Sequence, residues 1–366
     1  MENHFNKDFL VIYLRVVQGC NLNCAHCFTL GDRDPYKLID LKYVTSFLKQ
    51  IKIKINPKKA TVYIHGGETF LAPLGHLAEI NKIIKKELRD TLVNIIPQTN
   101  LMYEINEEYI DFIKNEYSCE MGVSWDYKIR FKKEGSHLDE NLFFKNLKKL
   151  TKEQINLSVA ITVQKYLLDC DVAELLPRFN GVKSLDFELL TIFDEKTKKL
   201  KVNNEEWSDF YFKIVDYYSR HKTTWSLPQV DLFTKSVLEN KIFNCKCNCC
   251  QHRTLTLNCN GTIGLCPDDA YVNPLSDIEE FEFNWNSFKE KSLHAHLKYL
   301  AQELQPMCAN CDFLDLCGGN CEQALFNEDD NECPLSKKVL KHQKENLHLF
   351  EKKLQEAKFN LIELKQ

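Results

Sequence analysis

The 366-residue sequence has no long hydrophobic run and no marked excess of charge of either sign. No window reaches the roughly 18 consecutive apolar residues of a membrane span, and residues 1–8 lack the basic-then-apolar layout of a signal peptide. Its 48 basic and 52 acidic residues leave a net charge of −4, which excludes a strong electrostatic footprint for nucleic acid or anionic lipid. We therefore expect a globular, cytoplasmic protein with no membrane or nucleic-acid partner.

The sequence is rich in cysteine, with 16 cysteine residues. In a reducing compartment so many thiols indicate metal ligation or redox chemistry and not structural disulfides. Three of them, Cys20, Cys24 and Cys27, lie within eight residues near the N-terminus. Eleven others lie between Cys245 and Cys333. The chain therefore has two separate cysteine regions, and we expect each to hold metal.

Residues 9–221 alternate short β-branched runs with longer amphipathic segments, which predicts six βα units in a row and a parallel α/β sheet with right-handed crossovers. The predicted strands are Leu10–Val17, Thr61–His65, Leu92–Gln98, Met121–Trp125, Leu157–Val163 and Ser184–Leu189. The predicted helices are Asp40–Ile51, His76–Arg89, Glu107–Asn115, Glu140–Glu153, Val172–Phe179 and Glu205–His221. We expect a connection over Thr223–Asn244 and a charged helical segment over Leu335–Leu364.

The first cysteine cluster directly follows the first predicted strand, and Gly66-Gly67-Glu68 follows the second. Functional loops of a parallel sheet lie at the carboxyl ends of its strands, so both segments open on the same edge. Three thiolates on one loop can bind three corners of an iron–sulfur cluster and leave the fourth iron open to an exogenous ligand. A structural zinc site would need its fourth ligand in place, and His26 lies between two of the cysteines, where its ring would be strained.

The spacing C-x3-C-x2-C, followed by Phe28, resembles the signature of the radical S-adenosylmethionine (SAM) superfamily. The resemblance implies a partial (β/α)6 barrel and a 4Fe–4S cluster whose open iron binds S-adenosylmethionine and whose electron releases a 5′-deoxyadenosyl radical. It also implies that Gly66, Gly67, Glu68 and Ser124 contact S-adenosylmethionine, and Phe28 and Asn100 are further candidates for binding it. Thr99 and Asp126 could line the same cavity, and His65, Trp125, Tyr127 and Arg130 its mouth.

The second cysteine region has the spacing Cys308-x2-Cys311-x5-Cys317-x3-Cys321, with Cys333 beyond. Together with Cys250, Gly261 and Cys266 this resembles the SPASM domain, a C-terminal extension of some radical SAM enzymes with two further 4Fe–4S clusters. The resemblance implies one cluster on Cys308, Cys311, Cys317 and Cys333. It implies a second on Cys250, Cys266, Cys321 and a fourth ligand, for which Cys245 is preferred over Cys247 and Cys249. Two zinc-ribbon sites are the alternative for these thiols.

With three clusters, the expected division is a radical SAM barrel over residues 9–222, a SPASM domain over 223–334 and a C-terminal helix over 335–366. Relatives with this arrangement mostly modify peptides or proteins. The leading hypothesis is therefore a maturase that crosslinks or oxidises a side chain of a ribosomally made peptide after hydrogen abstraction. Its expected partners are a peptide or protein substrate, an electron donor such as flavodoxin or ferredoxin, and a separate leader-peptide-binding protein or direct leader contact with the barrel mouth.

Two alternatives stay open. Sulfatase maturases of this type oxidise a cysteine or serine to formylglycine, and in them an aspartate directly follows the cysteine that corresponds to Cys266. Here Pro267 has that position, and Asp268 is the candidate catalytic base, with Asp269 next to it. The other alternative is a non-catalytic protein that binds iron–sulfur clusters or zinc.

Overall fold

The computed structural model describes residues 5–27, 37–132, 140–190, 192, 194–243, 253–268, 270, 273–279, 282–300, 308, 310–318, 333 and 336–363. It divides into two compact units. The first comprises residues 1–124, 130–155 and 249–302, and the second comprises residues 125–129, 156–248 and 303–366. Each unit therefore combines an N-terminal part of the chain with a distant C-terminal part. The division expected from the sequence, at residues 222 and 334, stays a prediction.

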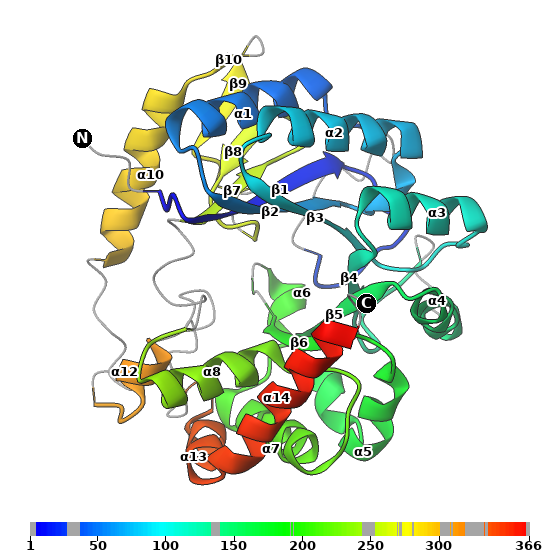
Figure 1. Cartoon of the computed structure of the whole chain (residues 1–366), viewed down its shortest axis with the longest axis vertical. Coiled ribbons are helices and arrows are strands. Elements are labelled where there is room, and N and C mark those ends of the chain that lie inside the picture. Colours follow the sequence, from blue (N-terminus) through cyan, green and yellow to red (C-terminus); the bar gives the residue numbers. More distant parts are fainter. Residues whose placement is uncertain are drawn as a thin grey trace. The chain divides into compact units, whose positions relative to one another are not determined.

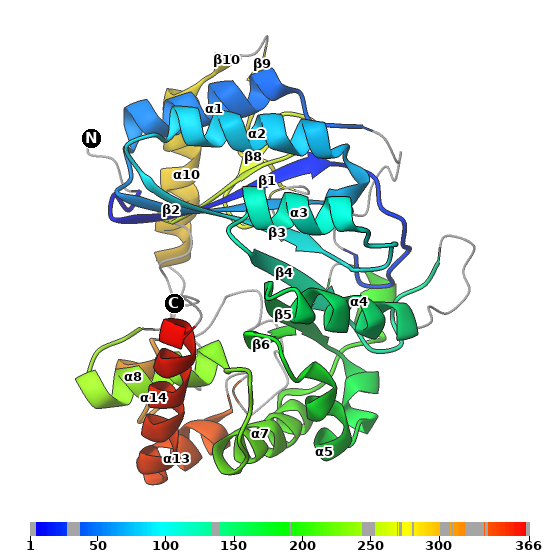
Figure 2. The same ribbon diagram turned by 45° about the vertical axis from the view of Figure 1, so that its right-hand side comes forward.

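The first unit is built on a mainly parallel sheet with helices after its strands. Its strands are β1 (Phe9–Val17), β2 (Lys59–Gly66), β3 (Leu92–Thr99), β4 (Glu120–Trp125), β7 (Thr254–Leu257), β8 (Thr262–Gly264), β9 (Ser276–Glu279) and β10 (Glu282–Phe283). Its helices are α1 (Leu41–Lys54), the short η1 (Thr69–Leu71), α2 (Leu74–Glu87), α3 (Glu107–Glu116), α4 (Asn141–Lys152) and α10 (Trp285–Leu300). Figures 1 and 2 show α1 and α2 side by side over one face of β1 and β2.

Strand β1 is central because it pairs in parallel with β2 on one side and with β7 on the other. Its residues Leu10, Ile12, Leu14 and Val16 are fully buried. Across the sheet, the strands of this unit lie in the order β10-β9-β8-β7-β1-β2-β3-β4. The pairs β7/β8, β8/β9 and β9/β10 are antiparallel. The cysteine-rich C-terminal region thus extends the sheet of the N-terminal strands directly, beside the strand that leads to Cys20.

Local sequence explains where the helices of this unit begin and how they pack. The Asp40 side chain accepts a hydrogen bond from the Lys42 amide at 2.7 Å and caps the start of α1. Val44, Phe47, Leu48 and Ile51 recur at helical spacing and are completely buried against the sheet. Helix α1 therefore covers the sheet with a single apolar face.

The second unit contains two parallel strands and a group of helices. The strands are β5 (Asn156–Val163) and β6 (Ser184–Leu189). The helices are η2 (Lys165–Asp169), α5 (Val172–Leu175), η3 (Leu176–Phe179), α6 (Glu195–Lys198), α7 (Asn204–Arg220), α8 (Pro228–Glu239), α12 (Leu314–Cys317), α13 (Lys337–Glu345) and α14 (Leu347–Glu363). The six predicted strands of the α/β part are confirmed, with bounds within two residues of those expected.

The connection expected over Thr223–Asn244 is wrong, because α8 occupies residues 228–239 of that segment. Pro228 stands at the first helical position, where its missing N–H costs nothing. Asn240 ends the helix in the left-handed conformation, with φ 47°. Proline and asparagine therefore bound a helix here, although both also occur in turns.

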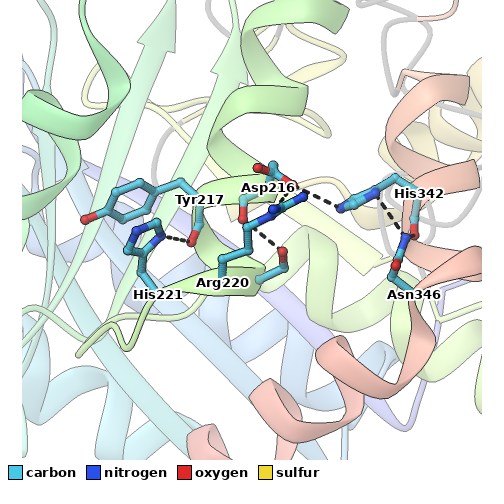
Figure 3. Close-up of polar contacts among 7 residues, drawn as sticks. Asp216, Tyr217, Arg220, His221, His342 and Asn346 are labelled. Carbon is cyan, nitrogen blue, oxygen red and sulfur yellow. Dashed lines mark hydrogen bonds and ion pairs between the residues drawn. The ribbon is translucent and has the colours of Figure 1, made fainter.

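The C-terminal helical segment is broken at Asn346 into α13 and α14. The Asn346 side chain donates to the His342 carbonyl at 3.0 Å and lies 3.2 Å from His342 Nδ1, as Figure 3 shows. The Asn346 main-chain N–H donates to the same carbonyl at 3.0 Å, so the side-chain bond adds a second donor at the end of α13. On the other side of His342, Asp216 on α7 lies 3.8 Å from its Nε2 and accepts from Arg220 at 2.8 Å (Figure 3). Helix α13 thus packs against α7.

In the part of the chain that the structure describes, no helix is both long and apolar enough to cross a membrane.

Candidate functional site

The carboxyl ends of β1 and β2 meet closely at the segment that follows each strand. The Gly67 amide donates to the Val17 carbonyl at 2.9 Å, and the Glu68 amide donates to the Gly19 carbonyl at 2.8 Å. A Cβ on Gly66 would lie 2.5 Å from the Val17 oxygen. Both glycines are therefore required by the close approach of two main chains, and this approach places the Cys20 loop beside Glu68.

The loop after β1 carries Cys20, Cys24 and Cys27, and all three are half-buried. The Leu22 amide donates to the Cys20 sulfur at 3.4 Å, and the Asn100 side-chain amide lies 3.8 Å from the same sulfur. Burial is the main cause that raises the pKa of the Cys20 thiol to about 11, and the nearby charges of Glu68 and Cys27 act in the same direction. Such a thiol becomes a thiolate when a cation binds its sulfur.

The donor set of this loop fits an iron–sulfur cluster in its chemistry. Three soft sulfur donors come from one loop, and the amides directed at Cys20 are the kind of hydrogen bonds that stabilise a ligating thiolate. As they lie, no three His, Cys, Asp or Glu side chains of the described residues could hold a metal ion. The assignment of these thiols to a cluster therefore remains a proposal.

Glu68 is a buried carboxylate that joins the ends of β2 and β3. Its Oε1 accepts from the Thr99 hydroxyl at 2.6 Å and from the Phe70 amide at 3.2 Å. Its Oε2 accepts from the Asn100 amide at 2.7 Å. The side chain is 2% exposed, and this burial raises its pKa to about 7. Glu68 therefore fixes the loops of the site from within, and few of its lone pairs remain for a bound molecule.

Asn100 is brought directly to the cysteine loop. Its side chain donates to Asn21 Oδ1 at 2.8 Å, and the Asn21 amide in turn donates to the Met102 carbonyl at 2.8 Å. The buried Arg130 donates to the Asn100 carbonyl at 3.3 Å. The Asn23 amide donates to the Phe131 carbonyl at 2.8 Å, which holds the loop on its other side. The cysteine loop is therefore positioned by two other loops of the same unit.

Sequence reasoning missed Asn21 as part of this network, although it lies inside the cysteine motif. Arg130 was expected only at the barrel mouth. Its guanidinium instead supports the backbone of the β3 loop. The available signals were that Asn21 lies inside the cysteine motif and that Arg130 is a charged residue near a strand end. Neither signal identifies the hydrogen-bond partner without the fold.

Ser124 and Asp126 lie at and beyond the end of β4. The Ser124 hydroxyl is half-buried and lies 3.5 Å from the Thr99 carbonyl, at the edge of hydrogen-bonding distance. The Asp126 carboxylate accepts from the Thr162 amide at 3.1 Å within the second unit. Ser124 is therefore one strand away from Glu68 and its partners, whereas Asp126 has a structural bond to β5.

The remaining predicted ligands are partly described. Cys266 follows β8 in the first unit, and Asp268 lies in the turn after it. In the second unit the Cys311 amide donates to the Cys308 carbonyl at 3.1 Å, and burial raises the pKa of the Cys308 thiol. Cys317 ends α12, and Cys333 lies three residues before Ser336, the N-cap of α13. The predicted residues that lie outside the described part are Phe28, Cys245, Cys247, Cys249, Cys250, Asp269 and Cys321.

Replacing Glu68 with glutamine tests the carboxylate network. The amide would face the Asn100 N–H with a second donor, so we expect the Glu68→Gln protein to lose about 2 kcal/mol of unfolding free energy. Because folding raises the pKa of Glu68 from 4.5 to about 7, the carboxyl contributes most stability below pH 4.5 and loses it as the pH rises through 7. Urea unfolding at about pH 5 and about pH 8 should therefore give a larger difference between the two proteins at the lower pH. An equal difference at both would contradict the raised pKa.

Comparison with known proteins places this arrangement in a structural context. No protein-family model matches the chain. It is 22% identical to a serine-type anaerobic sulfatase-maturating enzyme of Bacteroides thetaiotaomicron, over 88% of this chain and 84% of the relative.

Solved structures with the same fold include anSMEcpe with bound AdoMet and Kp18Cys peptide, with a TM-score of 0.75 and 19% identity over 93% of this chain and 98% of that chain. Streptococcus suis SuiB bound to the precursor peptide SuiA has a TM-score of 0.60 and 16% identity over 92% of this chain and 77% of that chain. The predicted fold, an α/β structure with a parallel central sheet and helices, is confirmed.

Proposed function

We propose that this protein acts as a radical SAM enzyme. It would cleave S-adenosylmethionine reductively and modify a side chain of a peptide or protein by hydrogen abstraction. A 4Fe–4S cluster held by Cys20, Cys24 and Cys27 would supply the electron and an open iron for S-adenosylmethionine. The observation that carries the proposal is the junction of this thiol loop with Gly66-Gly67-Glu68 and Asn100 at the carboxyl ends of parallel strands.

Each of these residues has a distinct task in this proposal. The Leu22 and Asn100 amides direct hydrogen bonds at the Cys20 sulfur and stabilise its thiolate. Gly66 and Gly67 carry no side chain, so the end of β1 and the cysteine loop can approach their main chain closely and lie beside Glu68. Glu68 holds the ends of β2 and β3 at a fixed separation through Thr99 and the Asn100 amide.

The second cysteine region would hold two auxiliary clusters. One is assigned to Cys308, Cys311, Cys317 and Cys333, and the other to Cys250, Cys266, Cys321 and an upstream cysteine, with Cys245 preferred. Full thiolate ligation leaves no open iron, so these clusters are suited to electron transfer or structural support. The resemblance to the SPASM domain supports these assignments, together with the turn that joins Cys308 and Cys311.

A peptide or protein substrate is supported by the neighbours with the same fold, which were solved with Kp18Cys and SuiA peptides. We favour maturation of a ribosomally made peptide, by crosslinking or oxidation of a side chain. An electron donor such as flavodoxin or ferredoxin and a separate leader-binding protein complete the proposed partners.

Sulfatase maturation is the second candidate, because the relative from Bacteroides thetaiotaomicron is a sulfatase-maturating enzyme. Pro267 is unfavourable for it, since proline stands where that class has its base. Asp268 would have to serve from the next position, where it is half-buried. Incubation with a serine- or cysteine-containing sulfatase peptide decides between the two. A product aldehyde that reacts with a hydrazide probe assigns sulfatase maturation, and its absence with this peptide counts against that candidate.

Anaerobic reconstitution tests the proposed chemistry itself. We expect the protein to bind about 12 irons and about 12 sulfides per chain and, with dithionite and S-adenosylmethionine, to release 5′-deoxyadenosine. Intact clusters without 5′-deoxyadenosine would reject the enzymatic proposal. A colourless protein with zinc would support the non-catalytic alternative instead.

A further inference from the structure

Arg15 is a buried cation on the strand that leads to the cysteine loop. It lies on β1, five residues before Cys20, and is 3% exposed. Strands β1 and β7 run in parallel and pair up to Leu14 and Leu257. The next residues along the chain are Arg15, still on β1, and Asn258, directly after β7, and this register brings their side chains together.

The two side chains form a clamp, the Arg15–Asn258 clamp, with four hydrogen bonds. Arg15 Nη1 donates to Asn258 Oδ1 at 3.0 Å, and Arg15 Nη2 donates to the Pro267 carbonyl. The Asn258 amide donates to the Ala270 carbonyl and to the Thr262 hydroxyl, at 2.8 Å each. Asn258 is fully buried. The planar guanidinium and the amide thus bind two main-chain carbonyls that lie three residues apart.

The clamp binds the turn that bears Cys266. The Ala270 amide closes this turn by donating to the Cys266 carbonyl at 2.8 Å. The Thr256 hydroxyl donates to the Leu265 carbonyl at 2.9 Å just before it. A Cβ on Gly264 would meet the Ala270 side chain at 2.5 Å, so the hairpin and the turn pack without spare room. The position of Cys266 is therefore determined from β1, through side chains and not through sheet pairing alone.

The positive charge of the clamp belongs to Arg15. His65, its register partner on β2, is half-buried, and burial together with the charge of Arg15 lowers its pKa to about 4. His65 is therefore neutral at neutral pH. The Arg15 guanidinium binds the carbonyl of Pro267, the residue directly after the proposed ligand Cys266. The reduced state of a thiolate-ligated cluster is the more negative one, so a nearby cation stabilises it.

We infer that Arg15 is a positioning residue for the proposed auxiliary cluster: it holds the Cys266 turn against β1 and raises the reduction potential of the cluster that Cys266 binds. The inference rests on the proposed function, because it requires that Cys266 be a cluster ligand. It goes beyond that function in linking the strand of the radical-site loop to one auxiliary cluster through two buried polar residues.

The test uses the full chain with Cys20→Ala, Cys24→Ala and Cys27→Ala, so that only auxiliary clusters contribute to the spectrum. Reductive titration followed by electron paramagnetic resonance is compared for this protein and for its Arg15→Met and Arg15→Lys derivatives. Arg15→Met is expected to lower the ratio of reduced to oxidised cluster at a fixed potential about tenfold, which is 59 mV for a one-electron couple. The second auxiliary cluster is the internal control and should keep its titration.

Arg15→Lys keeps the positive charge but loses the two-pronged guanidinium, whose Nη1 and Nη2 bind Asn258 and the Pro267 carbonyl at the same time. We expect it to change the line shape of one cluster's signal and to shift its titration less than Arg15→Met does. Thr91→Val is the matched control. The buried Thr91 hydroxyl also donates to a proline carbonyl, that of Pro57, and neither residue is near a cysteine in the sequence. Its signals should equal those of the parent protein.

The inference is overturned if Arg15→Met folds and retains the signals and titration of its parent. If Arg15→Met does not fold, Arg15→Lys decides: a changed signal of one cluster supports the inference, and a parental signal overturns it. If the parent itself binds no auxiliary cluster, the assignment of Cys266 in the proposed function fails, and the role of Arg15 fails with it.

Discussion

Replacing Gly67 with alanine is expected to cost about 3 kcal/mol of unfolding free energy and to displace the cysteine loop. A Cβ at this position would lie 2.1 Å from the Gly19 oxygen and 3.0 Å from the Cys20 nitrogen. Both are main-chain atoms, so no side-chain rotation relieves the contact, and the bond from the Glu68 amide to Gly19 must lengthen. Urea unfolding measures the loss, and iron binding by the reconstituted protein should fall with it.

Gly75→Ala is the matched control for this experiment. Gly75 lies on the first turn of α2, and a Cβ there would meet nothing within 4 Å. Alanine is the better helix former by up to about 1 kcal/mol, so Gly75→Ala should be neutral or stabilising. If Gly67→Ala were as harmless as Gly75→Ala, the close approach of the two loops would be refuted.

Replacing Cys24 with alanine is expected to remove one cluster, about four of about 12 irons, and to abolish release of 5′-deoxyadenosine. Cys24 is a better target than Cys20, whose sulfur accepts hydrogen bonds from the Leu22 and Asn100 amides and so also affects packing. The bond from the Cys27 amide to the Cys24 carbonyl is a main-chain bond and survives in alanine. Iron analysis and chromatography of the S-adenosylmethionine products measure both effects.

Cys170→Ala is the control for Cys24→Ala. Cys170 is also half-buried, and its amide makes a main-chain bond to Leu167, but it is not among the predicted ligands. It should retain all irons and full cleavage. Cleavage retained by Cys24→Ala would contradict the role of the N-terminal thiols, and cleavage lost in both variants would indicate general damage to the fold.

Strands were predictable here because their apolar residues form short runs between glycine-, proline- and asparagine-containing segments. Strand β1, for example, is buried at every second residue from Leu10 to Leu14 and then continuously from Leu14 to Val17. Helix α8 was missed because its boundary residues, Pro228 and Asn240, are equally common in loops. The break at Asn346 was missed because the apolar residues before and after it follow helical spacing.

The candidate site was predictable where it depends on residues close together in the chain. Cys20, Cys24 and Cys27 share one loop, and Gly66-Gly67-Glu68 follows a strand, so both could be placed at strand ends from the sequence. The bond between Asn21 and Asn100 joins residues 79 positions apart, and that between Arg15 and Asn258 joins residues 243 positions apart. Local patterns carry no information about such pairs.

By itself, the sequence determined the periodicity of the strands, the grouping of the thiols and the absence of side chains at Gly66 and Gly67, because each is a property of neighbouring residues. Only the tertiary structure decided that β7 pairs with β1, that Glu68 binds the end of β3 and that Arg15 holds the Cys266 turn. The reason is physical: register between strands sets which distant side chains meet, and register is determined by the packing of the whole core.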